Sequence, residues 1–171
     1  MRHLHINFNT IEFSKDEIAI TDPCYNKDVW CRINDVPIMS GLYRCVYTMI
    51  SSQEDGINIK SIAQTMIVHD DYLTAHPDII SLLQLEGWEY VGEIGVDSGM
   101  AGFFQDKPNF SNAEWSDLCQ SIDWKKNAYL ENSGKPNGWR GFWTGTNSDG
   151  GYPVYGIQEN GRYVALAIVL Q

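Results

Sequence analysis

The feature that most constrains this chain is the alternation of apolar and acidic residues along residues 88–97. The apolar residues of one parity are Trp88, Tyr90, Ile94 and Val96, and the acidic residues of the other parity are Glu89, Glu93 and Asp97. A period of two places these sets on opposite faces of an extended strand, one facing a core and one facing water. This pattern is typical of an antiparallel sheet, so the chain is predicted to contain one.

Further segments have a β-type pattern, and they are residues 17–20, 42–50, 57–68, 100–105, 139–146, 152–158 and 162–170. Residues 51–56 supply a turn, and the apolar parity shifts between Ile59 and Ile62, which predicts a bulge or break near Ser61. Asn160-Gly161 is a dipeptide that tight hairpins prefer, because both central residues need positive φ. Residues 163–170 are apolar on both faces, which predicts a central strand.

Two segments have helical patterns. Ser111 and Glu114 form a capping box, in which each side chain satisfies a free amide at the helix start. Apolar residues then follow at helical spacing, and they are Trp115, Leu118, Cys119 and Ile122, with Lys125 and Lys126 at the expected C-terminal end. A second, shorter helix is expected to begin at Pro77 and to end at Gly87.

Strands without regular intervening helices exclude a doubly wound parallel fold. The predicted class is mainly β (α+β), either an antiparallel two-layer sandwich or a curled sheet, with two short helices at its edge. A length of 171 residues suits a single globular domain over residues 1–171.

The chain has 12 basic and 22 acidic residues and a formal net charge of −10. A direct grip on nucleic acid is therefore not expected, because that grip depends on basic side chains at the phosphates. The longest apolar run, residues 164–170, is far shorter than a membrane span, so no membrane association is predicted. The N-terminus lacks the pattern of a signal peptide, and a cytoplasmic location is the expectation.

The cysteines, which are Cys24, Cys31, Cys45 and Cys119, have no regular spacing. Without a secretion signal, a disulfide framework is not expected in a chain of this size. The six residues between Cys24 and Cys31 exceed the gap of a zinc knuckle. We interpret the cysteines as reduced, mostly buried thiols and expect no cofactor.

Three loops carry an aspartate at a strand end, next to glycine or proline, and these aspartates are Asp22, Asp97 and Asp149. Aspartate accepts hydrogen bonds from its own downstream amides, and glycine lets the backbone bend or approach a ligand closely. Such loops line cation or sugar sites, and they are also an ordinary way for strands to turn. Both interpretations stay open at this point.

The same loops contain three motifs, in order Asp-Pro-Cys-Tyr from Asp22, Val-Asp-Ser-Gly from Val96 and Asp-Gly-Gly-Tyr-Pro-Val-Tyr from Asp149. Together they resemble an uncharacterised family of small bacterial and bacteriophage proteins, over nearly the whole chain. The resemblance implies a β-rich domain and convergence of the three loops, but it implies no established activity. Ser148 stands where the family commonly has glycine, so the third turn is expected to differ in shape.

Several enzymatic hypotheses follow from these loops. Asp97-Ser98-Gly99 is similar to the nucleophile loop of trypsin-like serine proteases, but Val96 replaces the preceding glycine. A Cys24 nucleophile would require His69 or His76 as its base, and the spacing gives no support for that. Converging carboxylates could hold a divalent metal that activates water, which makes a small metal-dependent hydrolase the alternative function.

The favoured function is a non-enzymatic binding or inhibitor protein. Aromatic faces with a few polar groups recognise sugars, bases and protein hot spots, and Trp139 joins several aromatic residues near the third loop. The resemblance suggests a phage protein that acts on a host defence factor or sequesters a small, nucleotide-like signalling molecule. The predicted ligand-binding residues are Asp22, Tyr25, Asp97, Ser98, Arg140, Trp143, Asp149, Tyr152 and Tyr155.

Overall fold

The computed structural model describes residues 5–105, 111–121, 130–131 and 140–171. The strands are β1 (His5–Phe13), β2 (Glu17–Thr21), β3 (Ile33–Pro37), β4 (Gly41–Glu54), β5 (Ile57–His69), β6 (Glu89–Val96), β7 (Met100–Gln105), β8 (Leu130–Glu131), β9 (Arg140–Gly145), β10 (Gly150–Glu159) and β11 (Arg162–Val169). The helices are α1 (Asp70–Ala75), α2 (Ile79–Leu83) and α3 (Asn112–Ser121).

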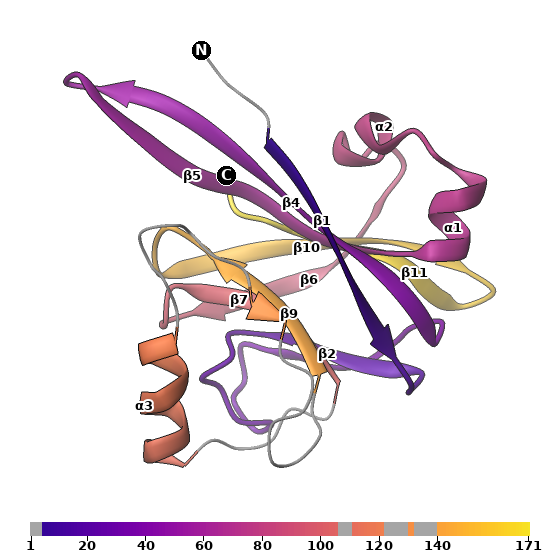
Figure 1. Ribbon diagram of the computed structural model, residues 1–171. Coiled ribbons are helices and arrows are strands. Elements are labelled where there is room, and N and C mark those ends of the chain that lie inside the picture. The colour runs from indigo at the N-terminus through magenta and orange to yellow at the C-terminus, as the bar shows by residue number, and fades with distance from the viewer. Residues whose placement is uncertain (1–4, 106–110, 122–129, 132–139) are drawn as a thin grey trace.

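The described strands form two sheets. The larger has the order β1-β4-β5-β11-β10-β6, and the smaller has the order β3-β2-β7-β9-β8. Every pairing between these strands is antiparallel. Figure 1 shows α1 and α2 on the side of the larger sheet away from the smaller one, and the β4–β5 hairpin projecting from the molecule. The predicted mainly β class with antiparallel sheets and few short helices is confirmed, whereas α1 and α2 cover a face of the larger sheet and not its edge.

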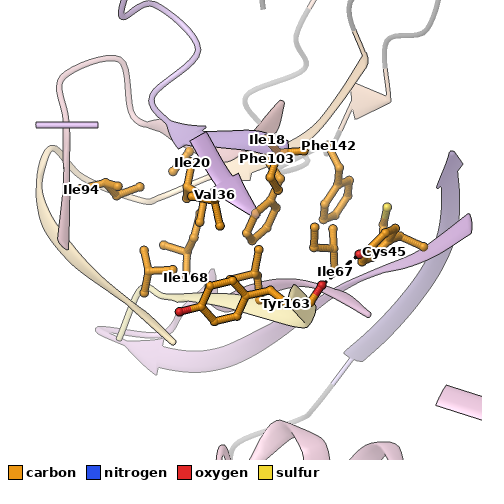
Figure 2. Packing of buried hydrophobic residues seen from close by; sticks show 14 of the residues in the cluster. Ile18, Ile20, Val36, Cys45, Ile67, Ile94, Phe103, Phe142, Tyr163 and Ile168 are labelled. Atoms are coloured by element: carbon orange, nitrogen blue, oxygen red, sulfur yellow. Dashed lines mark hydrogen bonds between the residues drawn. The ribbon is translucent and has the colours of Figure 1, made fainter. Parts of the chain in front are cut away.

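The main hydrophobic core lies between the two sheets (Figure 2). The smaller sheet contributes Ile18, Ile20, Val36, Phe103 and Phe142, and the larger contributes residues that include Ile67, Ile94, Tyr163 and Ile168. Burying these faces against each other removes a large apolar area from water, which is the dominant favourable term in folding. The two sheets therefore share one core.

A second apolar cluster lies on the other face of the larger sheet, beneath α1 and α2. It contains Val46, Met66, Val68, Leu82, Ala165 and Ala167. Strand β11 has one face in each cluster and lies between β5 and β10, so its predicted central position is confirmed. Its two apolar faces are explained by two covered sides of one sheet.

The local turn predictions have mixed outcomes. Asn160 and Gly161 both have positive φ, 53° and 78°, and they join β10 to β11 as predicted. The turn predicted within residues 51–56 is present but shorter, because β4 continues to Glu54 and Asp55-Gly56 alone reverse the chain. The bulge in β5 falls at Ala63, where the pairing with β4 shifts register, two residues from the predicted place.

Strand β1 was not predicted, because its apolar residues change parity along its length. Ile6 packs on the cluster beneath the helices, whereas Ile11 and Phe13 lie in the core between the sheets. The same strand thus contacts different apolar clusters with its two halves. No single period-two pattern describes such a strand.

Both predicted helices are present, and α1 is an additional one. Ser111 and Glu114 form the expected capping box, with the Ser111 amide 2.8 Å from the Glu114 carboxylate and the Glu114 amide 3.3 Å from the Ser111 hydroxyl. The apolar face predicted for this helix and the two lysines after it lie outside the described side chains. Among the described residues, no helix has the length and apolar character required to cross a membrane.

Candidate functional site

Asp22 follows the last residue of β2 and is completely buried. Its carboxylate accepts four hydrogen bonds, from the amides of Cys24, Asp97 and Ser98, each 2.8 Å long, and from the Ser98 hydroxyl at 2.6 Å. A buried carboxylate requires such donors, because burial removes its hydration. Asp22 therefore joins the loop after β2 to the loop after β6.

Asp97, whose amide bonds to the Asp22 carboxylate, has an exposed side chain. The Tyr25 hydroxyl donates a 2.6 Å hydrogen bond to Asp97 Oδ2. Burial raises the pKa of the Tyr25 hydroxyl, and its hydrogen bonds to Asp97 and Cys31 raise it further. The hydroxyl therefore keeps its proton at neutral pH and holds the Asp97 carboxylate in place as a donor.

The third loop is fixed from two directions. The Thr146 amide donates to the Gly99 carbonyl at 2.8 Å, which ties the loop to the turn before β7. The Asn147 side chain accepts from the Ile62 amide at 3.1 Å and donates to the Ile62 carbonyl at 2.9 Å. These bonds hold the loop beside the other two and leave Asp149 exposed at its tip.

Two surface grooves meet at Asp97. The first, which we term the Trp30 groove, has a volume of about 490 Å³ and is lined by residues that include Tyr25, Trp30, Glu93, Gly95, Asp97 and Gly151. The second has a volume of about 430 Å³ and runs from Asp97 and Ser98 to Asp149. The three aspartate loops thus converge. Asp22 is buried, whereas Asp97 and Asp149 are both exposed along the second groove.

Two glycines from neighbouring strands lie in the floor of the Trp30 groove. Gly95 of β6 lies directly opposite Gly151 of β10. A Cβ atom on Gly151 would come within 2.9 Å of the Glu93 carboxylate, and one on Gly95 would come within 2.9 Å of the Cys31 sulfur. The glycines therefore allow the Glu93 and Cys31 side chains to lie close against the sheet.

Trp30 forms one wall of this groove and is 92% exposed. A tryptophan side chain is usually largely buried, so this exposure is unusual for the residue type. Sequence analysis missed Trp30 as well as Glu93 and Cys31. The signal available for Trp30 was its position in a polar segment, residues 26–30, outside any apolar alternation.

The structure brings four of the predicted binding residues to the grooves, namely Tyr25, Asp97, Ser98 and Asp149. Arg140 lies at the opposite end of β9 from the third loop and donates to the Glu12 carbonyl at 2.9 Å. Trp143 is buried against Phe104, with ring centroids 5.4 Å apart. Neither residue reaches the grooves, and Trp139 lies outside the described residues.

The two predicted tyrosines of β10 have different surroundings. Tyr152 is buried, and its hydroxyl donates to the Ser148 carbonyl at 2.6 Å, so it supports the third loop from within. Tyr155 makes an edge contact with Tyr90 of β6, with centroids 5.8 Å apart. Tyr152 therefore acts on the loop from the core, and Tyr155 packs with a cross-strand neighbour.

The enzymatic hypotheses gain no support from this geometry. The Ser98 hydroxyl donates to buried Asp22, while the His69 ring contacts the Ser40 carbonyl and the Asp71 amide. The described residues contain no group of three or more histidine, cysteine, aspartate or glutamate side chains placed to hold a metal ion. Among the described residues, Cys24, Cys31 and Cys45 form no disulfide.

No family model, curated protein or solved structure matches the chain. The resemblance to a family of bacterial and bacteriophage proteins therefore stays a prediction. Any functional interpretation has to start from the grooves themselves.

Proposed function

We propose that this is a non-enzymatic binding protein and that the Trp30 groove is its ligand site. The observation that carries the proposal is Trp30, which is 92% exposed in a groove that also contains the Glu93 and Asp97 carboxylates. Binding sites combine an apolar surface with a few positioned polar groups. An exposed indole offers a large, rigid face that loses little conformational entropy when a ligand covers it.

The wall of the groove is held in place before any ligand arrives. The Tyr25 hydroxyl donates a hydrogen bond to the Asp97 carboxylate, and the Asp97 amide donates one to the buried Asp22 carboxylate. On the other side of the groove, the Gly95 amide donates to the Cys31 carbonyl at 2.8 Å. Preorganisation of this kind favours binding, because less conformational freedom is lost on association.

The alternative, a metal-dependent hydrolase, requires the three aspartates to share a cation. Asp22 accepts four hydrogen bonds from protein donors, which already occupy the lone pairs that a cation would need. Of the three carboxylates, this leaves Asp97 and Asp149 on the second groove. The geometry therefore favours binding over hydrolysis.

Within this proposal, the ligand is a partner whose activity the protein inhibits, or a small molecule that it sequesters. A bacteriophage origin and a host target extend the proposal through the family resemblance alone. The same groove serves each case, since inhibition and sequestration both begin with a stable complex.

Thermal melting of the wild type and of Trp30→Ala tests the proposal. The panel contains Mg²⁺, Ca²⁺, Mn²⁺, nucleotides, oligosaccharides and charged peptides. We expect one organic class to raise the Tm of the wild type but not of Trp30→Ala, with about 2.7 kcal/mol of stabilisation at roughly 100 times Kd. A shift with a divalent metal that Trp30→Ala keeps and Asp97→Asn loses would favour the hydrolase, and no shift with any class would contradict the groove as a ligand site.

A further inference from the structure

We propose that the Trp30 groove binds a basic segment of a partner protein and receives an arginine side chain between Trp30 and the Glu93 and Asp97 carboxylates. This inference rests on the proposed function and names the chemistry of its ligand. It follows from the signs of the charges along the two grooves and from the exposed indole.

The charged residues that line the two grooves are all acidic, and they are Glu93, Asp97 and Asp149. None of them forms an ion pair with a basic residue in the part of the chain that the structure describes, where the ion pairs are Arg44–Asp70 and Arg162–Asp16. The whole chain carries a net charge of −10. The field over the grooves therefore attracts a cation and repels a phosphate.

The loop that supplies Trp30 also separates its charges. Lys27 and Arg32 line a different cavity, together with residues of β2 and β3. Arg32 is held there by hydrogen bonds to the Tyr25 carbonyl at 2.9 Å and to Asn34 at 2.7 Å. The basic residues of this loop thus do not neutralise the Trp30 groove, which keeps its negative sign.

Arginine fits this groove better than lysine for geometric reasons. A planar guanidinium stacks on an indole face and bonds a carboxylate through two parallel donors, whereas an ammonium is a strongly hydrated point charge. The Glu93 carboxylate lies over Gly151, 2.9 Å from the position that a Cβ atom would take there, so this acceptor lies low in the groove, where a guanidinium that stacks on Trp30 can reach it. The Trp30 indole then stacks on one face of the guanidinium, and the Glu93 and Asp97 carboxylates accept hydrogen bonds from its edge.

The occupant is a chain segment because the acidic surface continues past one side chain. The second groove begins at Asp97, where the first ends, and leads to Asp149. A row of carboxylates along two joined grooves matches successive basic residues on one segment. A free monovalent cation would contact only some of these carboxylates and leave the others without a partner.

The test measures fluorescence anisotropy of a labelled peptide in which arginine alternates with glycine. Matched peptides replace arginine with lysine or with citrulline, which keeps the shape and removes the charge, and a labelled nucleotide serves as the anionic probe. The variants are Trp30→Ala and Glu93→Gln/Asp97→Asn. The control is Glu54→Gln/Asp55→Asn at the tip of the β4–β5 hairpin, which removes the same charge away from the grooves.

We expect the arginine peptide to bind best and the citrulline peptide to lose binding. Each groove variant should weaken the arginine peptide by about tenfold or more, which corresponds to roughly 1.4 kcal/mol, while the hairpin control changes Kd by less than about twofold. Raised salt should weaken the complex, since the contacts are at the surface. Circular dichroism and melting curves confirm that each variant is folded.

Other outcomes overturn the inference. Equal binding of the citrulline peptide would show that charge is not recognised, and an equal loss in the hairpin control would show attraction to net charge rather than to the groove. Absence of arginine-peptide binding to folded wild type would also overturn it. Nucleotide binding that depends on Trp30 would reject the cationic ligand but leave the proposed binding function intact.

Discussion

At the scale of single residues, Asp22 shows how one side chain can resemble a functional group and serve the fold. The sequence pattern groups it with Asp97 and Asp149, because each of the three aspartates lies at the end of a predicted strand next to glycine or proline. In the structure Asp22 has no exposed surface, and its four donors come from the loop after its own strand and from the loop after β6. Its role is to hold the Asp97 loop at the groove.

Asp22→Asn should lower the free energy of unfolding by about 2–3 kcal/mol, which urea denaturation would measure. The amide is isosteric, but in either orientation its NH₂ group faces at least one backbone amide donor, and the charge is lost. Asp97→Asn is the control, because Asp97 is exposed, and it should change stability by less than about 0.5 kcal/mol. Equal effects of the two substitutions would contradict this role for Asp22.

At the scale of elements, the grooves depend on loops held by strands that are distant in sequence. The loop before β10 is attached to β5, because Asn147 bonds both backbone groups of Ile62 next to the bulge at Ala63. A bulge leaves backbone groups without ladder partners, and a side-chain amide supplies both a donor and an acceptor there. Asn147 also has a φ of 71°, a conformation that asparagine tolerates better than most residues.

Asn147→Ala should destabilise the protein by about 1–3 kcal/mol, because both Ile62 groups lose their partner and alanine disfavours positive φ. Asn147→Asp keeps the acceptor for the Ile62 amide and should have an intermediate effect in the same urea experiment. Hydrogen exchange at the Ile62 amide reports the contact directly, and faster exchange is expected in the alanine variant. Unchanged exchange there would show that the loop is held by other contacts.

At the scale of the whole molecule, two sheets enclose a core that also contains buried hydroxyl groups. Thr144 of β9 is completely buried, two residues after core residue Phe142, and its hydroxyl has no hydrogen-bond partner among the described residues. Thr146 is equally buried, but its hydroxyl donates to the Ser148 carbonyl at 2.7 Å. The two threonines therefore differ in partner and not in burial.

Thr144→Val should leave the free energy of unfolding unchanged or raise it by up to about 1 kcal/mol, since a buried hydroxyl without a partner is replaced by a methyl group. Thr146→Val should lower it by about 1 kcal/mol, because the hydrogen bond between the Thr146 hydroxyl and the Ser148 carbonyl is lost and the Tyr152 hydroxyl remains as the donor to that carbonyl. Urea denaturation of both variants gives the comparison. A larger loss for Thr144→Val than for Thr146→Val would reject this assignment of partners.

The sequence by itself determined the features that depend on neighbouring residues. The strand over residues 89–96, the Asn160-Gly161 hairpin and the capping box at Ser111 are each set by local geometry, and each is present in the structure. The shared core face predicted for residues 88–97 is correct for Ile94 and Val96. It is wrong for Tyr90, which is 61% exposed, and for Trp88, which packs on the cluster beneath the helices, because the pairing of β6 with β10 shifts register between them and Ile94. The β-rich class follows from these local features, because short alternating strands can bury their apolar faces only in packed sheets. These features required no knowledge of which strands meet.

Only the tertiary structure decided which polar and aromatic residues are accessible. Asp22 is buried and Asp97 exposed because one loop lies over the other, and Trp143 is buried while Trp30 is exposed because only Trp143 lies within a packed sheet. Burial depends on contacts between residues far apart in the chain, such as Asp22 with Ser98, which no local pattern encodes. The groove is therefore a property of the packed sheets, and its tryptophan became a candidate only once they were in place.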